Sequence, residues 1–75
     1  MIKLHQFESC PYCQRVRLVL EAKGIEYEKI ETPQNRDDRT VIFELSGQYL
    51  VPVLVDGEKV LSDSSAIIAY LNEKY

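Results

Sequence analysis

Hydrophobic positions in the first third of the chain switch from strand spacing to helical spacing and back again. The pattern predicts a strand over residues 2–7, a helix over residues 11–23 and a second strand over residues 25–31. Gly24 follows the helix as a natural stop. A helix between two strands makes a parallel strand–helix–strand unit the simplest interpretation.

The rest of the chain predicts two further helices and a hairpin. A helix is expected from about Gln34 to Leu45, after a highly charged start. The Asp56-Gly57 pair stands between two apolar runs and is a strong hairpin signal. Ser62 and Asp63 can cap a last helix. The predicted fold class is therefore α/β, of order βαβαββα, with a mixed four-stranded sheet and three helices.

Composition adds limits to this picture. With 75 residues, of which 45% are hydrophobic and 28% charged, we expect one soluble domain over residues 1–75 and a monomer. The net charge of −3 argues against nucleic acid as a partner. The longest apolar run, residues 50–55, is far too short to cross a membrane. The opening residues carry no signal-peptide pattern, so we expect a cytoplasmic protein.

The two cysteines, Cys10 and Cys13, are the residues most suggestive of chemistry. A structural zinc site usually needs four ligands, and the chain offers only these thiols and one histidine before carboxylates, so we expect no metal. A permanent disulfide between residues three apart would close a very small loop and stabilise little. A cycling redox pair is the remaining interpretation, and it is compatible with the cytosol.

The local sequence supplies a mechanism for redox activity. Pro11 fits the first position of a helix, which makes Cys10 the N-cap residue. The sulfur of Cys10 would face free amide groups and the positive end of the helix dipole, and both favour a thiolate. Cys13, one turn later, would be more buried and less ionised. We therefore predict that Cys10 is the nucleophile and Cys13 the resolving thiol, with Tyr12 beside them as a flat wall for a substrate.

Three stretches of this chain resemble known families. Cys10-Pro11-Tyr12-Cys13 is similar to the active-site motif of dithiol glutaredoxins, and "SGQYLVP" resembles the glutaredoxin segment that ends in Val-Pro. "LSDSSAIIAYL" resembles a stretch in the N-terminal domain of glutathione S-transferases. The resemblance covers nearly all of the chain. It implies a glutaredoxin with a transferase-like glutathione site, on the thioredoxin-like fold that both families share.

The resemblance also implies roles for four more residues. Pro52 is expected to be cis, which would turn the backbone of Val51 towards the active cysteine and let it pair with glutathione as an added strand does. Asp63 and Ser64 are expected to bind the ammonium and carboxylate of the γ-glutamyl group. A helix start suits a carboxylate, and the simpler role for both residues, as helix caps, is compatible with this one.

The chain departs from the glutaredoxin pattern at two positions. Phe7 and Gln48 stand where many glutaredoxins carry a lysine and an arginine that serve glutathione or the thiol. Gln48 can still donate a hydrogen bond. Other cations could add charge near the site, although a solvated helix face is the simpler expectation for each: Arg15, Arg17, Arg36 and Arg39.

The leading hypothesis is a glutathione-dependent thiol–disulfide oxidoreductase that acts on disulfide-containing or glutathionylated proteins. One alternative is a thioredoxin-like reductant served by a flavoprotein reductase. Another is a glutathione transferase that conjugates electrophiles, which normally requires an added helical domain. A non-enzymatic module, such as a glutathione-ligated iron–sulfur carrier, is a further alternative. Such carriers usually have Cys-Gly-Phe-Ser in place of Cys10-Pro11-Tyr12-Cys13.

Overall fold

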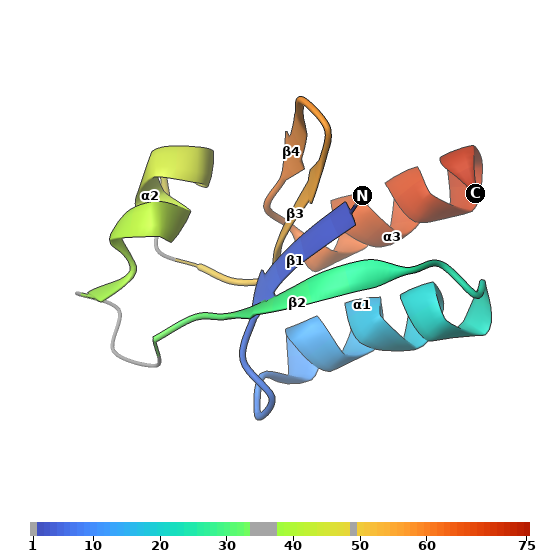
Figure 1. Cartoon of the computed structure of the whole chain (residues 1–75), viewed down its shortest axis with the longest axis horizontal. Coiled ribbons are helices and arrows are strands. Elements are labelled where there is room, and N and C mark those ends of the chain that lie inside the picture. The colour runs from blue at the N-terminus through green and yellow to red at the C-terminus, as the bar shows by residue number, and fades with distance from the viewer. Residues whose placement is uncertain (1, 34–37, 49) are drawn as a thin grey trace.

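The computed structural model describes residues 2–33, 38–48 and 50–75. Seven elements follow one another in the predicted order (Figure 1). They are β1 (Ile2–Gln6), α1 (Pro11–Ala22), β2 (Tyr27–Glu31), α2 (Thr40–Ser46), β3 (Val53–Asp56), β4 (Lys59–Leu61) and α3 (Ser64–Lys74).

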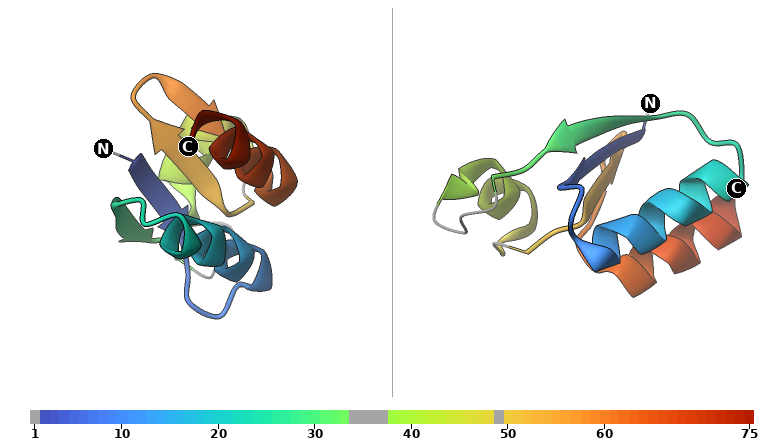
Figure 2. Two further views of the ribbon diagram at one scale, coloured as in Figure 1. Left: turned by 90° about the vertical axis from the view of Figure 1, so that its right-hand side faces the viewer. Right: turned by 90° about the horizontal axis from the view of Figure 1, so that it is seen from below.

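The four strands form one mixed sheet in the order β2-β1-β3-β4. β1 pairs with β2 in parallel and with β3 antiparallel, and β3 and β4 make the hairpin. Helices α1 and α3 lie side by side on one face of the sheet, and α2 lies apart from them (Figure 2). This is the thioredoxin-like fold that the sequence predicts.

The main core lies between the sheet and the α1–α3 layer. Its residues come from two central strands and from one face of each of the two helices, as an amphipathic helix on a half-buried sheet requires. The buried members are Ile2, Leu4, Val16, Leu20, Leu54, Ile67 and Leu71. The helical spacing in the first predicted helix therefore marks the face that packs on the sheet.

Several element boundaries differ from the predictions. β2 begins at Tyr27 rather than at residue 25. α2 begins at Thr40, and the predicted start of that helix at Gln34 lies outside the described residues. In the hairpin, Asp56 is still paired with Lys59, so the turn residues are Gly57 and Glu58 rather than the predicted Asp56-Gly57 pair. Gly57 has a φ of 62°, a conformation that a residue with a Cβ rarely adopts.

The sheet topology brings three loops to one end of the molecule. Because β1 and β3 are antiparallel, with His5 opposite Val53, the end of β1 lies beside the start of β3. The first of these loops leads into α1, and the second contains Pro52. The short connection after β4 leads into α3 at the same end. The fold thus places the starts of two helices next to the start of a central strand.

Candidate functional site

Cys10 caps the N-terminus of α1, as the sequence predicts. It has extended backbone angles (φ −78°, ψ 116°), and Pro11 is the first helical residue. The backbone N–H of Cys13 donates a hydrogen bond to Cys10 Sγ at 3.3 Å. Sulfur thus occupies the place usually taken by the oxygen of a capping serine or aspartate. A negative charge on this sulfur would face the free amides of the first turn.

The two thiols have different surroundings. Both are free cysteines, with Cys10 5% exposed and Cys13 fully buried. Burial, together with the hydrogen bond to Cys10, raises the pKa of Cys13 to about 12. Since the thiolate is the reactive form, the geometry favours Cys10 as the sulfur that meets a substrate. The predicted division of roles between the two cysteines agrees with this arrangement.

A pocket of about 340 Å³ opens beside the start of α1. It unites the five residues that were expected to bind glutathione, one from its place beside the cysteines and four from the resemblance: Tyr12, Val51, Pro52, Asp63 and Ser64. The Val51–Pro52 peptide bond is cis, which confirms the expectation for this segment. Its remaining lining residues were not predicted: Arg15, Leu50, Ser62 and Ser65.

Asp63 and Ser64 line this pocket at the start of α3. Asp63 is the N-cap residue, and its Oδ2 accepts a hydrogen bond from the backbone N–H of Ala66 at 3.1 Å. Ser64 is the first helical residue and is buried. The first backbone amides of a helix have no partner within it and attract carboxylates. Asp63 therefore caps the helix through one carboxylate oxygen. The other carboxylate oxygen is available for a ligand.

Arg15 and Asp63 are the charged residues of the pocket lining. Arg15 is exposed, as expected, and it lies one helical turn after Tyr12, so both side chains emerge on the same side of α1. A pocket with one cation, one carboxylate and a helix start suits an α-amino acid group, which carries both charges. The i, i+3 spacing from Tyr12 is the sequence signal that could have identified Arg15.

Gln48 and Arg39, two positions considered for the site, lie away from this pocket. Gln48 is exposed and is not among the described residues that line the pocket. Its backbone N–H donates to the hydroxyl of Ser46, and its C=O accepts from the same hydroxyl. Arg36 lies outside the described residues. Arg39 is buried, contrary to the expectation of a solvated position. Its Nε donates to the Pro33 carbonyl at 2.8 Å and its guanidinium lies 5.3 Å from the Phe7 ring centre.

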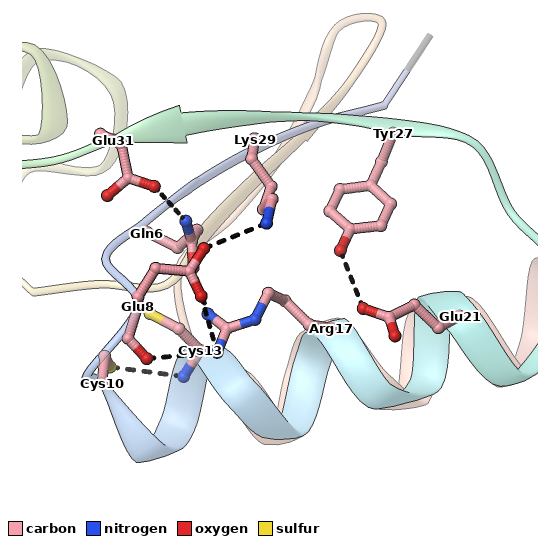
Figure 3. A network of polar contacts seen from close by, with 9 residues as sticks. All are labelled: Gln6, Glu8, Cys10, Cys13, Arg17, Glu21, Tyr27, Lys29 and Glu31. Atoms are coloured by element: carbon pink, nitrogen blue, oxygen red, sulfur yellow. Dashed lines mark hydrogen bonds and ion pairs between the residues drawn. The ribbon is translucent and has the colours of Figure 1, made fainter.

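Arg17 also departs from expectation. Its predicted place was a solvated helix face, and it is instead only 8% exposed. Its side chain lies between α1 and the strands, within a network of polar contacts that joins the helix to β1 and β2 (Figure 3). Its guanidinium donates hydrogen bonds to the side chain of Gln6 and to the backbone carbonyl of Glu8. An alternating pattern of polar residues in a helix does not reveal which of them turns inward, so the sequence could not identify this one.

Residues 2–33, 38–48 and 50–75 contain neither a metal-binding group nor a membrane-spanning helix. Within these ranges no group of three or more histidine, cysteine, aspartate or glutamate side chains is placed to hold a metal ion. In the same part of the chain, no helix is both long and apolar enough to cross a membrane.

Comparison with known proteins places this site in a family. Residues 4–75 match the model of the glutathione S-transferase N-terminal domain. Glutathione S-transferase Z1 of Arabidopsis thaliana is 38% identical over 76 residues, which cover 99% of this chain and 34% of that protein. Maleylpyruvate isomerase of a Ralstonia species is 34% identical over 76 residues, covering 99% of this chain and 36% of its own length.

Solved structures agree. Glutathione transferase E6 from Drosophila melanogaster superposes with a TM-score of 0.90 at 31% identity, over 100% of this chain and 35% of that chain. A glutathione S-transferase from the Antarctic clam Laternula elliptica has the same TM-score at 33% identity, over 99% of this chain and 35% of that one. The chain thus spans about a third of the length of the relatives it matches.

Proposed function

The chain belongs to the glutathione S-transferase N-terminal domain family, and from this premise we propose that it binds glutathione and uses Cys10 for thiol–disulfide exchange. Family membership supports glutathione, the substrate of these enzymes. The Cys10–Cys13 pair supports the exchange chemistry. The finer assignment, a glutaredoxin-type activity in a transferase-type domain, rests on the cysteine sulfur that caps α1, the helix that also carries the pocket-lining residues Tyr12 and Arg15.

In the proposed complex, each part of glutathione has a partner in the pocket. The cysteinyl backbone pairs with the N–H and C=O of Val51, as an added strand would. The γ-glutamyl ammonium meets Asp63, and its carboxylate meets the start of α3 at Ser64. Tyr12, exposed at the pocket wall, covers the tripeptide. The glutathione sulfur then points towards Cys10.

The proposed reaction begins with the Cys10 thiolate. It attacks the glutathione sulfur of a glutathionylated protein, a Cys10–glutathione disulfide forms, and the protein thiol leaves as a thiolate. A second glutathione thiolate attacks the glutathione sulfur of that disulfide. Glutathione disulfide departs and Cys10 is regenerated as thiolate. With a protein disulfide as substrate, Cys13 instead attacks Cys10, and an internal disulfide replaces the mixed one.

A second candidate function is conjugation or isomerisation with glutathione as the reactive thiol. Similarity to maleylpyruvate isomerase and to glutathione S-transferase Z1 supports it. In this reaction Cys10 would act without a covalent bond, by stabilising the glutathione thiolate at the start of α1. The substrate pocket would then need residues beyond the third of the relatives' length that this chain matches.

The two candidates differ in their dependence on Cys10. We expect Cys10→Ser to abolish the release of glutathione from a glutathionylated peptide, because serine cannot form the mixed disulfide. Cys13→Ser should retain that activity, since a second glutathione resolves the intermediate, and should lose activity on protein disulfides. Mass spectrometry of Cys13→Ser after exposure to glutathione disulfide should find one glutathione on Cys10.

Other outcomes identify the alternatives. Unchanged conjugation of an electrophile by Cys10→Ser, with no peptide activity in the wild type, would support the transferase function. Activity that depends on thioredoxin reductase and ignores glutathione would support a thioredoxin-like reductant.

A further inference from the structure

Arg17 is a buried cation one helical turn after Cys13, and it has no role in the proposed steps at Cys10. Arginine is rarely buried unless it is paired. Positions four apart in a helix are neighbours, so Arg17 and Cys13 lie on the same inward face of α1. Figure 3 shows both side chains on the side of α1 that faces β1 and β2.

The partners of Arg17 lie on β1 and on the loop that leads to Cys10. Gln6 is fully buried and accepts a hydrogen bond from Arg17 through Oε1, while its Nε2 donates to Glu31 at 2.9 Å. The Glu8 carbonyl accepts a second bond from Arg17 at 3.3 Å. In the same loop, the Cys10 N–H donates to the Phe7 carbonyl at 3.1 Å. Arg17 thus holds the loop that positions the first cysteine.

The positive charge of Arg17 is only partly neutralised. Its nearest carboxylate, Glu8, lies 3.7 Å away and is mostly exposed, while Lys29 on β2 contacts that same carboxylate at 3.0 Å. Gln6 is neutral. Burial is the main cause that raises the pKa of Cys13, and the charge of Arg17, like a backbone hydrogen bond at Phe7, acts in the opposite direction. Residual positive charge therefore lies on the same inward face of α1 as the buried thiol.

We propose that Arg17 is a positioning residue for the resolving step, in which its charge favours the Cys13 thiolate and its bond to the Glu8 carbonyl holds Cys10 within reach. The inference rests on the proposed function. In this step Cys13 loses its proton to solvent and its sulfur attacks Cys10 Sγ. A Cys10–Cys13 bond forms, the bond between Cys10 and glutathione breaks, and glutathione leaves as a thiolate.

The size of the effect follows from the charge. Removal of a partly compensated cation near a buried thiol should lower the thiolate fraction about tenfold, one unit of pKa. A more basic thiolate is intrinsically more nucleophilic, which recovers about threefold of that loss. We therefore expect the resolving step to slow by about threefold from charge alone, and by up to about tenfold if the loop also loses its position.

The experiment mixes the reduced wild-type protein with glutathione disulfide and quenches with acid at successive times. Mass spectrometry then follows the mixed disulfide on Cys10 and the internal disulfide. Arg17→Gln should still form the mixed disulfide and should convert it about threefold to tenfold more slowly. Its rate against pH should rise at higher pH than that of the wild type. Arg17→Lys, which keeps the charge, should retain most of the wild-type rate and the wild-type pH profile.

Two more variants keep the test decisive. Glu8→Gln removes the competing carboxylate from an exposed position and should speed the resolving step, by up to about twofold. Lys23→Gln removes the same charge as Arg17→Gln from the exposed end of the same helix and should change nothing. If Arg17→Gln does not fold, the faster resolving step in Glu8→Gln, with no change in Lys23→Gln, decides the question.

Contrary results are equally clear. Wild-type kinetics in Arg17→Gln, or equal slowing in Arg17→Lys and Arg17→Gln with no shift in pH profile, would overturn the inference while a mixed disulfide on Cys10 upholds the proposed function. If the wild type forms no mixed disulfide at all, the proposed function fails and this inference fails with it.

Discussion

The two ends of the molecule each contain a polar cluster, and the clusters are built differently. At the site end, Arg17 and Gln6 are buried, and their bonds reach the backbone of the loop before Cys10. At the far end, Asp56 on the hairpin accepts hydrogen bonds from Tyr70 at 2.7 Å and Tyr75 at 2.9 Å, and Lys74 lies 3.3 Å away.

The difference indicates that one polar cluster of this small domain affects the reactivity of the cysteines and the other affects stability. The far cluster is partly exposed, and in it one carboxylate oxygen of Asp56 accepts hydrogen bonds from three donors in the last part of α3 and at the residue after it. It ties that helix to the hairpin. The site cluster holds the positive charge of Arg17 on the same helix face as a buried thiol. The low dielectric constant of the protein interior strengthens electrostatic interactions there. We expect changes at the site end to alter reactivity and changes at the far end to alter unfolding.

The largest effect expected at the site end is the difference between the two thiols. At pH 7 roughly one Cys13 thiol in 100,000 is ionised, given its pKa of about 12. Iodoacetamide should therefore modify Cys10 at least about a hundredfold faster, as measured by peptide mapping. In denatured protein the two rates should converge. Equal rates in the folded protein would contradict the assigned roles.

The next effect concerns the pocket. Asp63→Asn should weaken glutathione binding by roughly tenfold to a hundredfold, because a charge-assisted hydrogen bond contributes about 1.5–3 kcal/mol. Asparagine also caps helices well, so the midpoint of urea unfolding should not change. Isothermal titration calorimetry with glutathione measures the loss. Unchanged affinity would leave Asp63 as a helix cap alone.

A smaller effect is expected at Arg15, because this side chain is exposed and its charge is screened. Arg15→Gln should weaken glutathione binding by about twofold to fivefold. If Arg15 meets the γ-glutamyl carboxylate, γ-glutamylcysteine should lose affinity by the same factor. Lys23→Gln, on the same helix but outside the pocket, is the matched control. A loss confined to glutathione would instead place Arg15 at the glycine end.

The effect expected at the far end is on stability and not on binding or reactivity. Asp56→Asn should lower the free energy of unfolding by about 1–2 kcal/mol, because charge-assisted bonds from Tyr70 and Tyr75 become neutral ones. Glutathione affinity should be unchanged. Urea denaturation gives the first quantity and calorimetry the second. A loss of binding with intact stability would show that the two ends are not separate.

The pH dependence sharpens the same point. The hydrogen bond from Tyr70, followed by those from Tyr75 and Lys74, lowers the pKa of Asp56 in the folded protein. A lowered folded pKa means that this stabilisation is present above the carboxyl's usual range and is lost as pH falls through it. Asp56→Asn should therefore flatten the acid side of the stability curve. An unchanged curve would assign the acid response to other carboxylates.

The order of elements was predictable because it depends on local signals, whereas most of the expected pocket residues came from the family resemblance. The spacing of apolar residues marks the strands and helices, and Pro11 and Asp63 mark helix starts. The cis bond at Pro52 came from resemblance, since a Val-Pro pair alone does not specify it. Arg17 and Arg39 were not predictable as buried residues, because their burial depends on partners from distant strands and loops. Arg15 has a local signal in its i, i+3 spacing from Tyr12, but its place in the pocket also depends on the packing of α1 beside α3.

β2 forms one edge of the sheet, and its outer residues protect the protein from association. An unpaired edge strand can add a strand from another copy, which leads to aggregation. Here Glu28, Lys29 and Glu31 are all exposed along a strand of only five residues. Charges of this kind disfavour edge-to-edge pairing. Two of these residues also belong to the polar network around Arg17, in which Lys29 contacts Glu8 and Glu31 accepts a hydrogen bond from Gln6. The same side chains therefore support the helix that carries the cysteines and disfavour the addition of another strand to the sheet.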